Sequence, residues 1–498
     1  MAVILGIDLG TSSLKAMLLD EETGVLDVRV KEYGVDIPHP GYAQQNPRVW
    51  WEALKEVLGK LREEWPEAFS RVDAVGYSGQ MHGLVLAGED GSPLCPAIIW
   101  MDQRSGACLQ EIENRMSREE MGRQLCNRVS SGFAFPSLLW VKEEKPEWFV
   151  RAETVFCPKD YLRFLMTGER GAEVVDASST GMFDTARRDW AWELLDDWGL
   201  PERLFPEVKE SCQVAGTISS WCAGETGLRE GIPVIYGSGD QPAQSIGNGV
   251  IQEGRLIANI GTGGQISAFS RKPVYDAKLR TNTFCHAVEG AWTIFGATLS
   301  AGMSLGWLKN RLFREESYET VNREAKAAGP GAGGLLYLPY LSGERTPHMN
   351  PRARGMFFGL TLGQERGEFF RAVMEGVTYS LRDCLEVLKE NGVDGEEILA
   401  SGGGASSRLW LQIQADILEK PIRACRVKEQ ACLGSCILAG YGTGILPSLE
   451  EGCRRFSVLD EEVFFPEEKN REIYGEGYRK FRELYRRTEE LMEREGAE

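Results

Sequence analysis

Two short segments rich in glycine and threonine, half a chain apart, constrain the fold more than any other feature. They are DLGTSS at 8–13 and NIGTGG at 259–264. Each lies between two apolar, β-rich runs, which predicts a β-hairpin with the small residues at its turn. Such turns leave backbone N–H groups free to hold phosphate. We therefore expect a duplicated fold with a nucleotide between its halves; two unrelated glycine turns are the alternative.

The runs around the turns also repeat. Residues 2–7, 14–19 and 25–33 predict a three-strand meander around the first turn, and 256–260 and 265–269 follow the same order around the second. A chain of 498 residues exceeds what one core usually supports. We therefore expect an α/β protein of two domains, residues 1–250 and 251–498.

Composition restricts the partners. The net charge of −18 argues against non-specific nucleic-acid binding, so a nucleotide would have to be held by backbone dipoles and Mg²⁺. No apolar run is long enough to cross a bilayer, and the N-terminus lacks a basic leader region. We expect a cytoplasmic protein with neither a nucleic-acid nor a membrane partner. Cys425, Cys432 and Cys436 have no histidine nearby, and packing explains them better than a metal site.

Asp240 is the strongest candidate for chemistry. It lies in GSGDQP at 237–242, after an apolar strand at 233–236 and before a predicted helix. Glycines there let a ligand approach the backbone closely, and a carboxylate can accept a proton from a substrate hydroxyl. Capping of the helix N-terminus by the aspartate is the alternative.

Three histidines lie in unusual surroundings: His82, His286 and His348. His82 has the best context, because SGQMHG at 78–83 follows a predicted strand at 72–77, where an α/β sheet ends and ligands usually bind. Asp102 and Arg104 follow another apolar strand. They form either an ordinary ion pair or a brace for a ligand pocket.

A third glycine segment, SGGGASS at 401–407, follows an apolar strand and precedes a helical pattern. This layout suits an adenosine lying against backbone and a helix N-terminus. The chain has neither a P-loop pattern nor the glycine spacing of a dinucleotide site, so neither class is indicated.

These motifs occur together in one order, with W-x-D-x-R at 100–104, TFCHA at 283–287 and LPYLSGERTPH at 338–348. From Ile4 to about Tyr441 the chain resembles the FGGY carbohydrate kinases. GQMHG combined with LSGERTPH resembles the branch that phosphorylates D-xylulose. The resemblance implies two ribonuclease-H-like domains of the actin/hexokinase/Hsp70 type around a central cleft.

The resemblance also implies residue roles in an ATP- and Mg²⁺-dependent transfer of phosphate to the C5 hydroxyl of the sugar. Asp240 is the expected general base, and Asp8 and Asp240 are the expected carboxylates at the metal. The expected sugar contacts are Gln80, Met81, His82, Asp240 and Gln241. The expected ATP contacts are Thr11, Ser12, Lys15, Gly261, Thr262, Gly263, Gly302, Gly403 and Ser407. A homodimer is plausible.

Some positions depart from the commoner pattern of that branch. Met101 and Gln241 stand where asparagine is frequent, and QACLGSC at 430–436 replaces a run richer in alanine and glycine. The first two affect the expected sugar, not the phosphoryl transfer. Two alternatives remain: a kinase of the same family for another ketose, a polyol or a sugar acid, and an ATPase or sugar-binding regulator of the same fold. GQMHG and GSGDQ together disfavour the second, because a nucleotide switch needs no sugar base.

Overall fold

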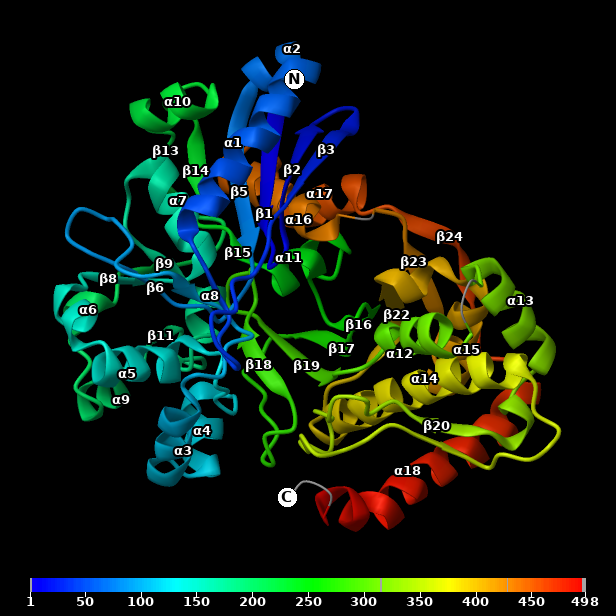
Figure 1. Cartoon of the computed structure of the whole chain (residues 1–498). Helices are drawn as coiled ribbons and strands as arrows, with labels where there is room; N and C mark the ends of the chain where they lie inside the picture. The colour runs from blue at the N-terminus through cyan, green and yellow to red at the C-terminus, as the bar shows by residue number, and fades with distance from the viewer. Residues whose placement is uncertain (1, 314–315, 428, 495–498) are drawn as a thin grey trace.

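The computed structural model describes residues 2–313, 316–427 and 429–494, which form two α/β halves (Figure 1). The N-terminal half contains a seven-stranded mixed sheet of β13 (Val214–Thr217), β14 (Pro233–Ile235), β5 (Val72–Gly79), β1 (Val3–Leu9), β2 (Ser13–Asp20) and β3 (Gly24–Glu32), in that order, with β15 (Ser238–Gly239) also on β5. The C-terminal half contains β18 (Asn282–Cys285), β19 (Trp292–Thr298), β17 (Gly264–Ser270), β16 (Gly254–Ile260), β22 (Gly395–Ser401), β23 (Ile422–Cys425) and β24 (Leu459–Phe464).

The two sheets repeat one pairing scheme, as the sequence predicts. β1 is antiparallel to β2 and parallel to β5, and β16 is likewise antiparallel to β17 and parallel to β22. Both glycine–threonine segments are the turns of antiparallel hairpins. Across the first, Asp8 pairs with Lys15; across the second, Asn259 pairs with Gln265. The polar residues of the two turns therefore occupy equivalent places at one end of each sheet.

Strand β1 is buried on both faces, because its alternate residues face different layers. Val3, Leu5 and Ile7 belong to the core that includes Trp50 of α1 (Pro47–Glu64). Ile4 belongs instead to the core that contains Cys436. Cys436 lies on α16 (Gln430–Gly442), which comes from the distant C-terminal part of the chain.

Glycines let α16 lie directly on the first sheet. A Cβ on Gly6 would be 2.4 Å from the carbonyl oxygen of Cys432, and a Cβ on Gly76 would be 2.1 Å from that of Ser435. On its other side α16 contacts α11 (Asp240–Gly247), where a Cβ on Gly434 would be 1.9 Å from the Ala243 carbonyl oxygen. Figure 1 shows α16, in orange, beside α11 and the blue strands. Residues 430–442 thus complete the core of the N-terminal half, and the linear division at residue 250 stays a prediction.

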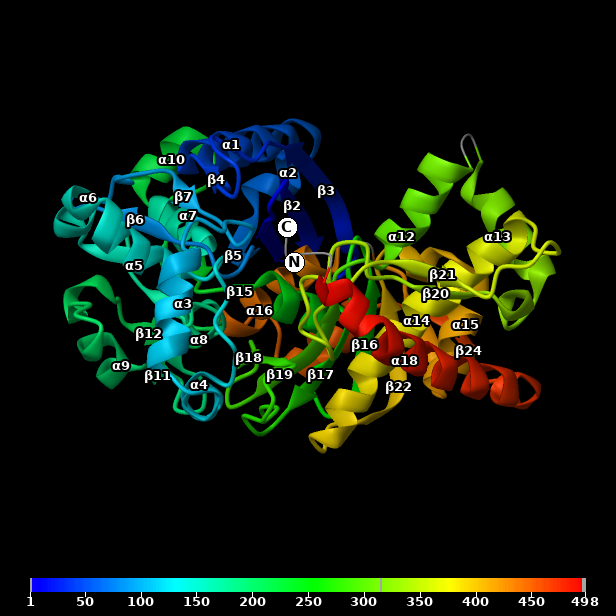
Figure 2. The same cartoon turned by 60° about the horizontal axis from the view of Figure 1, so that its bottom comes forward.

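The C-terminal half is built around α14 (Arg366–Glu390), whose apolar residues recur at helical spacing and are buried in its core. α12 (Gly302–Trp307), α13 (Tyr318–Ala328), α15 (Arg408–Leu418) and α18 (Arg471–Arg494) surround it (Figure 2). The tail aromatics Tyr474, Tyr478, Phe481 and Tyr485 are buried in the same core, so packing explains them. In the described part of the chain no helix is both long and apolar enough to span a membrane.

The remaining helices include α5 (Ala134–Glu144), α7 (Pro158–Thr167), α8 (Val174–Ser178) and α17 (Leu449–Phe456). α17 follows α16 and joins the same core through Cys453 and Phe456. α7 lies with α1 on the other face of the first sheet, where Tyr161, Leu162 and Met166 are buried.

Candidate active site

Two cavities meet at Asp240. The histidine cavity, of about 270 Å³, is lined by residues of both halves: Thr11, Gln80, Met81, His82, Trp100, Arg128, Ser130, Phe133, Asp240, Gln241, Gln265, Leu279, Asn282, Phe284, Phe295, Ala297, Arg345 and Met349. The acidic cavity, of about 280 Å³, is lined by Asp8, Lys15, Asp240, Gln241, Gln244, Asn259, Gln265, Glu429, Gln430 and Ala431. Because Asp240, Gln241 and Gln265 line both, a molecule in one cavity can react with a molecule in the other beside the Asp240 carboxylate.

The fold places Asp240 at this junction. β15 pairs with the end of β5, and α11 begins immediately after it with Asp240 as its first residue. Gly239 occupies the N-cap position, so the interpretation of Asp240 as the capping residue is wrong. Burial, and then the charge of Asp8, raise the pKa of Asp240 to about 7. That pKa is suited to a base that works near neutral pH.

Asp8 and Lys15 form the polar floor of the acidic cavity. Asp8 accepts a hydrogen bond of 2.8 Å from the Ser78 hydroxyl, and burial raises the pKa of its carboxyl. Burial works against the charge of Lys15, but the carboxylate of Glu429, 2.5 Å from its ammonium, leaves the Lys15 pKa raised. Sequence analysis missed Glu429. Only the spatial return of α16 to the first sheet brings it to Lys15.

His82 presents one defined nitrogen to the histidine cavity. Its Nδ1 lies 2.8 Å from the carbonyl oxygen of Ser179, which can only accept, so Nδ1 carries the proton. Burial lowers the pKa of His82 to about 4, which keeps the ring neutral. The ring is stacked on Phe133 at 4.3 Å between centroids, and the backbone has φ 73°, uncommon outside glycine. Nε2 is therefore a hydrogen-bond acceptor held in a fixed direction.

Gln45 fixes the amide of Gln80 in the same way. The indole N–H of Trp50 donates to the Gln45 Oε1, so this oxygen is an acceptor, and the Gln80 amide nitrogen donates to it at 3.0 Å. The Gln45 amide nitrogen donates to the carbonyls of Thr11 and Gly34. Gln80 Oε1 is buried without a hydrogen-bond partner among the described residues. Gln80 thus offers an acceptor, and Gln45, which sequence analysis missed, holds its orientation.

Asp102 and Arg104 line neither cavity, and they contact the segment next to Gln45. Asp102 is fully buried; its carboxylate accepts from the Arg104 guanidinium and from the backbone N–H of Ala43, the latter at 2.6 Å. The guanidinium also donates to Gln44 and lies over the ring of Tyr42. The pair therefore anchors the segment that carries Gln45. Met101 is 45% exposed and lines neither cavity, whereas Gln241 lines both.

The glycine residues expected at ATP converge at the end of β16. The backbone N–H of Gly302 donates to the carbonyl of Gly261, and those of Ala301 and Met303 donate to Thr262. A Cβ on Gly404 would be 2.7 Å from Ile260, the last residue of β16, so the 401–407 segment lies on the same strand end. Gly261, Thr262, Gly263, Gly302 and Gly403 are thus gathered around one strand end.

Two other expected ATP contacts, Thr11 and Ser407, have hydroxyls that are already hydrogen-bonded. The Thr11 hydroxyl accepts from the Trp100 indole at 2.9 Å, and Thr11 lines the histidine cavity, not the acidic one. Ser12 is exposed at the turn. Ser407 caps α15 by accepting from the Trp410 N–H, and its hydroxyl donates to Asn322. Of Thr11, Ser12, Lys15 and Ser407, Lys15 alone lines the acidic cavity.

His286 and His348 lie outside both cavities. His286 is buried beside Phe269 and accepts from the Val288 N–H, while His348 stacks on Tyr485. Cys432 and Cys436 are buried in the core, as the packing interpretation predicts.

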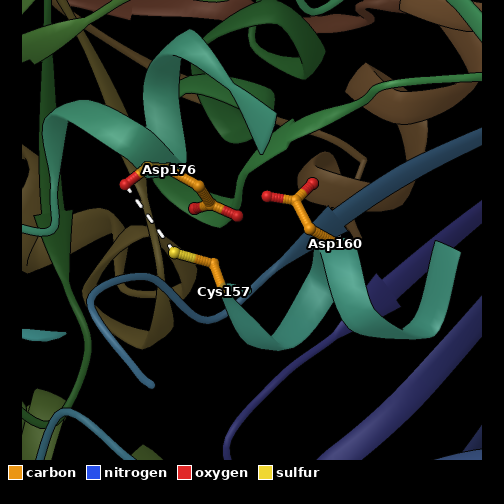
Figure 3. Close-up of side chains that lie close together, drawn as sticks. All are labelled: Cys157, Asp160 and Asp176. Atoms are coloured by element: carbon orange, nitrogen blue, oxygen red, sulfur yellow. Dashed lines mark hydrogen bonds between the residues drawn. The ribbon is translucent and has the colours of Figure 1, made fainter. Parts of the chain in front are cut away.

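Cys157, Asp160 and Asp176 form a compact buried group, with the two carboxylates facing each other (Figure 3). The Lys159 ammonium lies 2.7 Å from an Asp160 oxygen and 3.4 Å from an Asp176 oxygen. The Lys159 ammonium lies between these acids and the Arg163 guanidinium lies 3.8 Å from Asp160, so the group is an ion-pair cluster. Lys159 also donates to the Tyr236 carbonyl, which ties the cluster to the segment before Asp240.

Models of the FGGY family of carbohydrate kinases match most of the chain, the N-terminal domain over residues 3–247 and the C-terminal domain over 256–443. The chain belongs to the FGGY family of carbohydrate kinases. It is 36% identical to a xylulose kinase of Staphylococcus epidermidis, over 98% of this chain and 97% of that protein. It is 30% identical to a gluconokinase of Bacillus subtilis, over 90% and 89%.

Among solved structures, a xylulose kinase from Rhodospirillum rubrum matches with a TM-score of 0.92 and 28% identity, over 99% of this chain and all of that one. This FGGY kinase thus has the actin/hexokinase/Hsp70-type fold that the sequence predicts. It is a phosphotransferase that acts on an alcohol group of a sugar, and both its halves contribute to the site. Its partners are accordingly a sugar and ATP.

Proposed function

We propose that this FGGY kinase phosphorylates D-xylulose at the C5 hydroxyl, giving D-xylulose 5-phosphate and ADP. The observation that carries the proposal is the position of Asp240, between a cavity suited to a polyhydroxylated molecule and an acidic cavity suited to metal and phosphate. The full-length likeness to xylulose kinases supports the choice of sugar.

The histidine cavity suits a sugar because its acceptors are fixed in place. His82 Nε2 and Gln80 Oε1 each face a direction set by other hydrogen bonds, so hydroxyls can donate to them with little loss of side-chain freedom. Phe133, Phe284 and Met81 provide apolar walls for the carbon skeleton. Gln241, next to the base, has a buried Oε1 without a partner among the described residues, a further acceptor.

In the proposed reaction the ionised Asp240 carboxylate takes the proton of the C5 hydroxyl. The sugar oxygen forms a bond to the γ-phosphorus of ATP, and the bond to the bridging oxygen breaks, so that ADP leaves. The N–H groups of Gly10 and Gly261 donate within their own turns, so the N–H groups at 11–12 and 262–263, with the Lys15 ammonium, would hold the phosphates from both sides. Glu429 keeps Lys15 charged and directed into the acidic cavity.

The acidic cavity fits Mg²⁺. Asp8 and Asp240 both line it, burial raises the pKa of each, and their mutual repulsion adds to that of Asp240. Carboxylate oxygens are the ligands that Mg²⁺ prefers, and a cation between them would relieve this repulsion. Asp8 and Asp240 would hold the ion, which would neutralise charge on the phosphates during transfer.

The substrate is tested by an ADP-release assay over pentuloses, polyols and sugar acids. We expect D-xylulose to give the largest kcat/KM, because the chain is similar over its full length to xylulose kinases. The panel includes gluconate, because the chain is also similar to a gluconokinase. If a sugar acid or a polyol exceeds D-xylulose, the proposed substrate is wrong. If no member of the panel stimulates ADP release, D-xylulose is not the substrate and the sugar lies outside the panel.

The pH dependence of kcat/KM should report the ionisation of Asp240. Its raised pKa, about 7, means that the carboxyl is protonated below that value and cannot act as a base. We expect kcat/KM for the sugar to rise with pH and reach a plateau, falling about tenfold per unit on the acid side. Bound Mg²⁺ would move this limb to lower pH. A profile measured from pH 5 to 8.5 that is flat throughout would contradict the role.

A further inference from the structure

Among the described residues, Arg345 is a charged side chain of the histidine cavity whose guanidinium has no hydrogen bond or ion pair. It lies in the 343–350 loop of the C-terminal half, within the LPYLSGERTPH motif at 338–348. Its side chain lines the histidine cavity. The guanidinium has no hydrogen bond or ion pair to any other residue that the structure describes.

The backbone of this loop is held rigidly at the end of β19. The Glu344 carboxylate accepts from the Thr298 hydroxyl at 2.5 Å, from the Leu299 N–H at 3.0 Å and from the Arg345 N–H at 2.7 Å. Thr346 exchanges two hydrogen bonds with Ala297. The Glu344 carboxylate and the Thr346 hydroxyl are thus engaged, while the Arg345 guanidinium has no hydrogen bond to the described residues.

The surroundings of the guanidinium favour a ligand. Arg345 is exposed to solvent within the cavity, and partial loss of hydration lowers its pKa against the opposing charge of Glu344. Its charge also helps to lower the pKa of His82. Arg128, the other arginine lining this cavity, is paired with Glu113 at 2.6 Å. Arg345 is therefore the arginine of this cavity whose guanidinium stays available to donate to a bound molecule.

The two walls of the cavity are complementary in hydrogen bonding. On the N-terminal side, His82 Nε2, Gln80 Oε1 and the Asp240 carboxylate are acceptors. Arg345 reaches in from the C-terminal half with donors only. A ketose has hydroxyls that can satisfy acceptors and one carbonyl oxygen that can only accept.

We propose that Arg345 is a sugar-binding and specificity-determining residue that donates to the carbonyl oxygen of the ketose. This rests on the proposed function, since it takes the sugar to be a ketose. The sugar then joins the two halves, with its reacting hydroxyl at Asp240 and its carbonyl at Arg345. A polyol, which has a hydroxyl in place of the carbonyl, binds Arg345 less well.

The test compares Arg345→Met and Arg345→Lys with Arg352→Met, at an exposed arginine just after the loop that lines neither cavity. For Arg345→Met we expect the KM for D-xylulose, and its Kd by calorimetry without nucleotide, to rise about tenfold or more, with the KM for ATP within about twofold. The preference for D-xylulose over xylitol should shrink. Arg345→Lys should be intermediate, and Arg352→Met should match the unaltered protein in kinetics and melting temperature.

Unchanged D-xylulose KM and Kd in Arg345→Met would overturn the proposal, as would a rise in the KM for ATP alone, which would place the guanidinium on phosphate. If Arg345→Met weakens the binding of D-xylulose and xylitol equally, Arg345 does not contact the carbonyl oxygen. If the unaltered protein neither binds nor phosphorylates D-xylulose, the proposed substrate fails separately. The same variants are then titrated with the panel sugar that the unaltered protein accepts, and an unchanged Kd overturns the sugar contact.

Discussion

Replacing Asp240 by asparagine is expected to lower kcat by about 10²–10⁴-fold. The amide has nearly the same shape as the carboxyl but cannot take the proton of the sugar hydroxyl. Asp240 lies where both cavities meet, so the variant keeps the walls of each. Binding of ATP, measured by calorimetry, should change little by comparison.

The same substitution should not harm stability. Asp240 has a folded-state pKa of about 7, above its ordinary value of 3.8, so its ionisation opposes folding increasingly as pH rises between these values. At pH 8 the Asp240→Asn protein is therefore expected to melt at the same temperature as the unaltered protein or higher, whereas below pH 4 the two should differ little. Near-normal turnover in such a well-folded variant would remove Asp240 from the role of base. A lower melting temperature at pH 8 would instead show that the carboxylate stabilises the fold.

The second large effect is expected from Gly434→Ala in α16. The new Cβ would lie 1.9 Å from the backbone oxygen of Ala243 in α11, and backbone cannot turn aside as a side chain can. The two helices must move apart, which costs about 1–3 kcal/mol or more in an already packed core. α11 begins at Asp240, so its displacement misplaces the base, and a shift of about 1 Å at a reacting group can cost about 100-fold in rate.

Gly59→Ala in α1 is the matched control. It is also a helical glycine, but a Cβ there meets no atom within 4 Å. Alanine is favoured over glycine in helices by about 1 kcal/mol, so this variant should be slightly more stable and fully active. Thermal melting and kcat of both variants, measured together, check the expectation. If Gly434→Ala behaves like Gly59→Ala, then the contact between α11 and α16 is not as close as described.

Local sequence patterns predicted the two hairpins, the positions of Asp240 and His82, and the helix α14. The hairpins at 8–13 and 259–264 form because small residues lie between strand-like runs, and the turns fall where expected. Asp240 and His82 could be found for the same reason, since each directly follows the end of a predicted strand. The long helix α14 has a plain apolar stripe.

Contacts between distant segments could not be predicted. Gln45 matters only because folding brings it to Gln80 and Trp50, and a glutamine in the two-residue strand β4 (Gln44–Gln45) gives no local signal. Glu429 approaches Lys15 across 414 positions of sequence. Thr11 follows the phosphate-turn pattern, but its hydroxyl is taken by Trp100, whose side chain the pattern does not include.

The return of α16 to the first sheet has a consequence for biosynthesis. When residues 1–250 have left the ribosome, the face of β1 and β5 that carries Gly6 and Gly76 still lacks its cover, because that cover is residues 430–442. Ile4 and Met17 stay exposed to water and to other nascent chains until then. The N-terminal half therefore depends on late synthesis to finish its core, and a fragment ending near residue 250 should need a chaperone, or α16 supplied as a separate peptide, to remain monomeric.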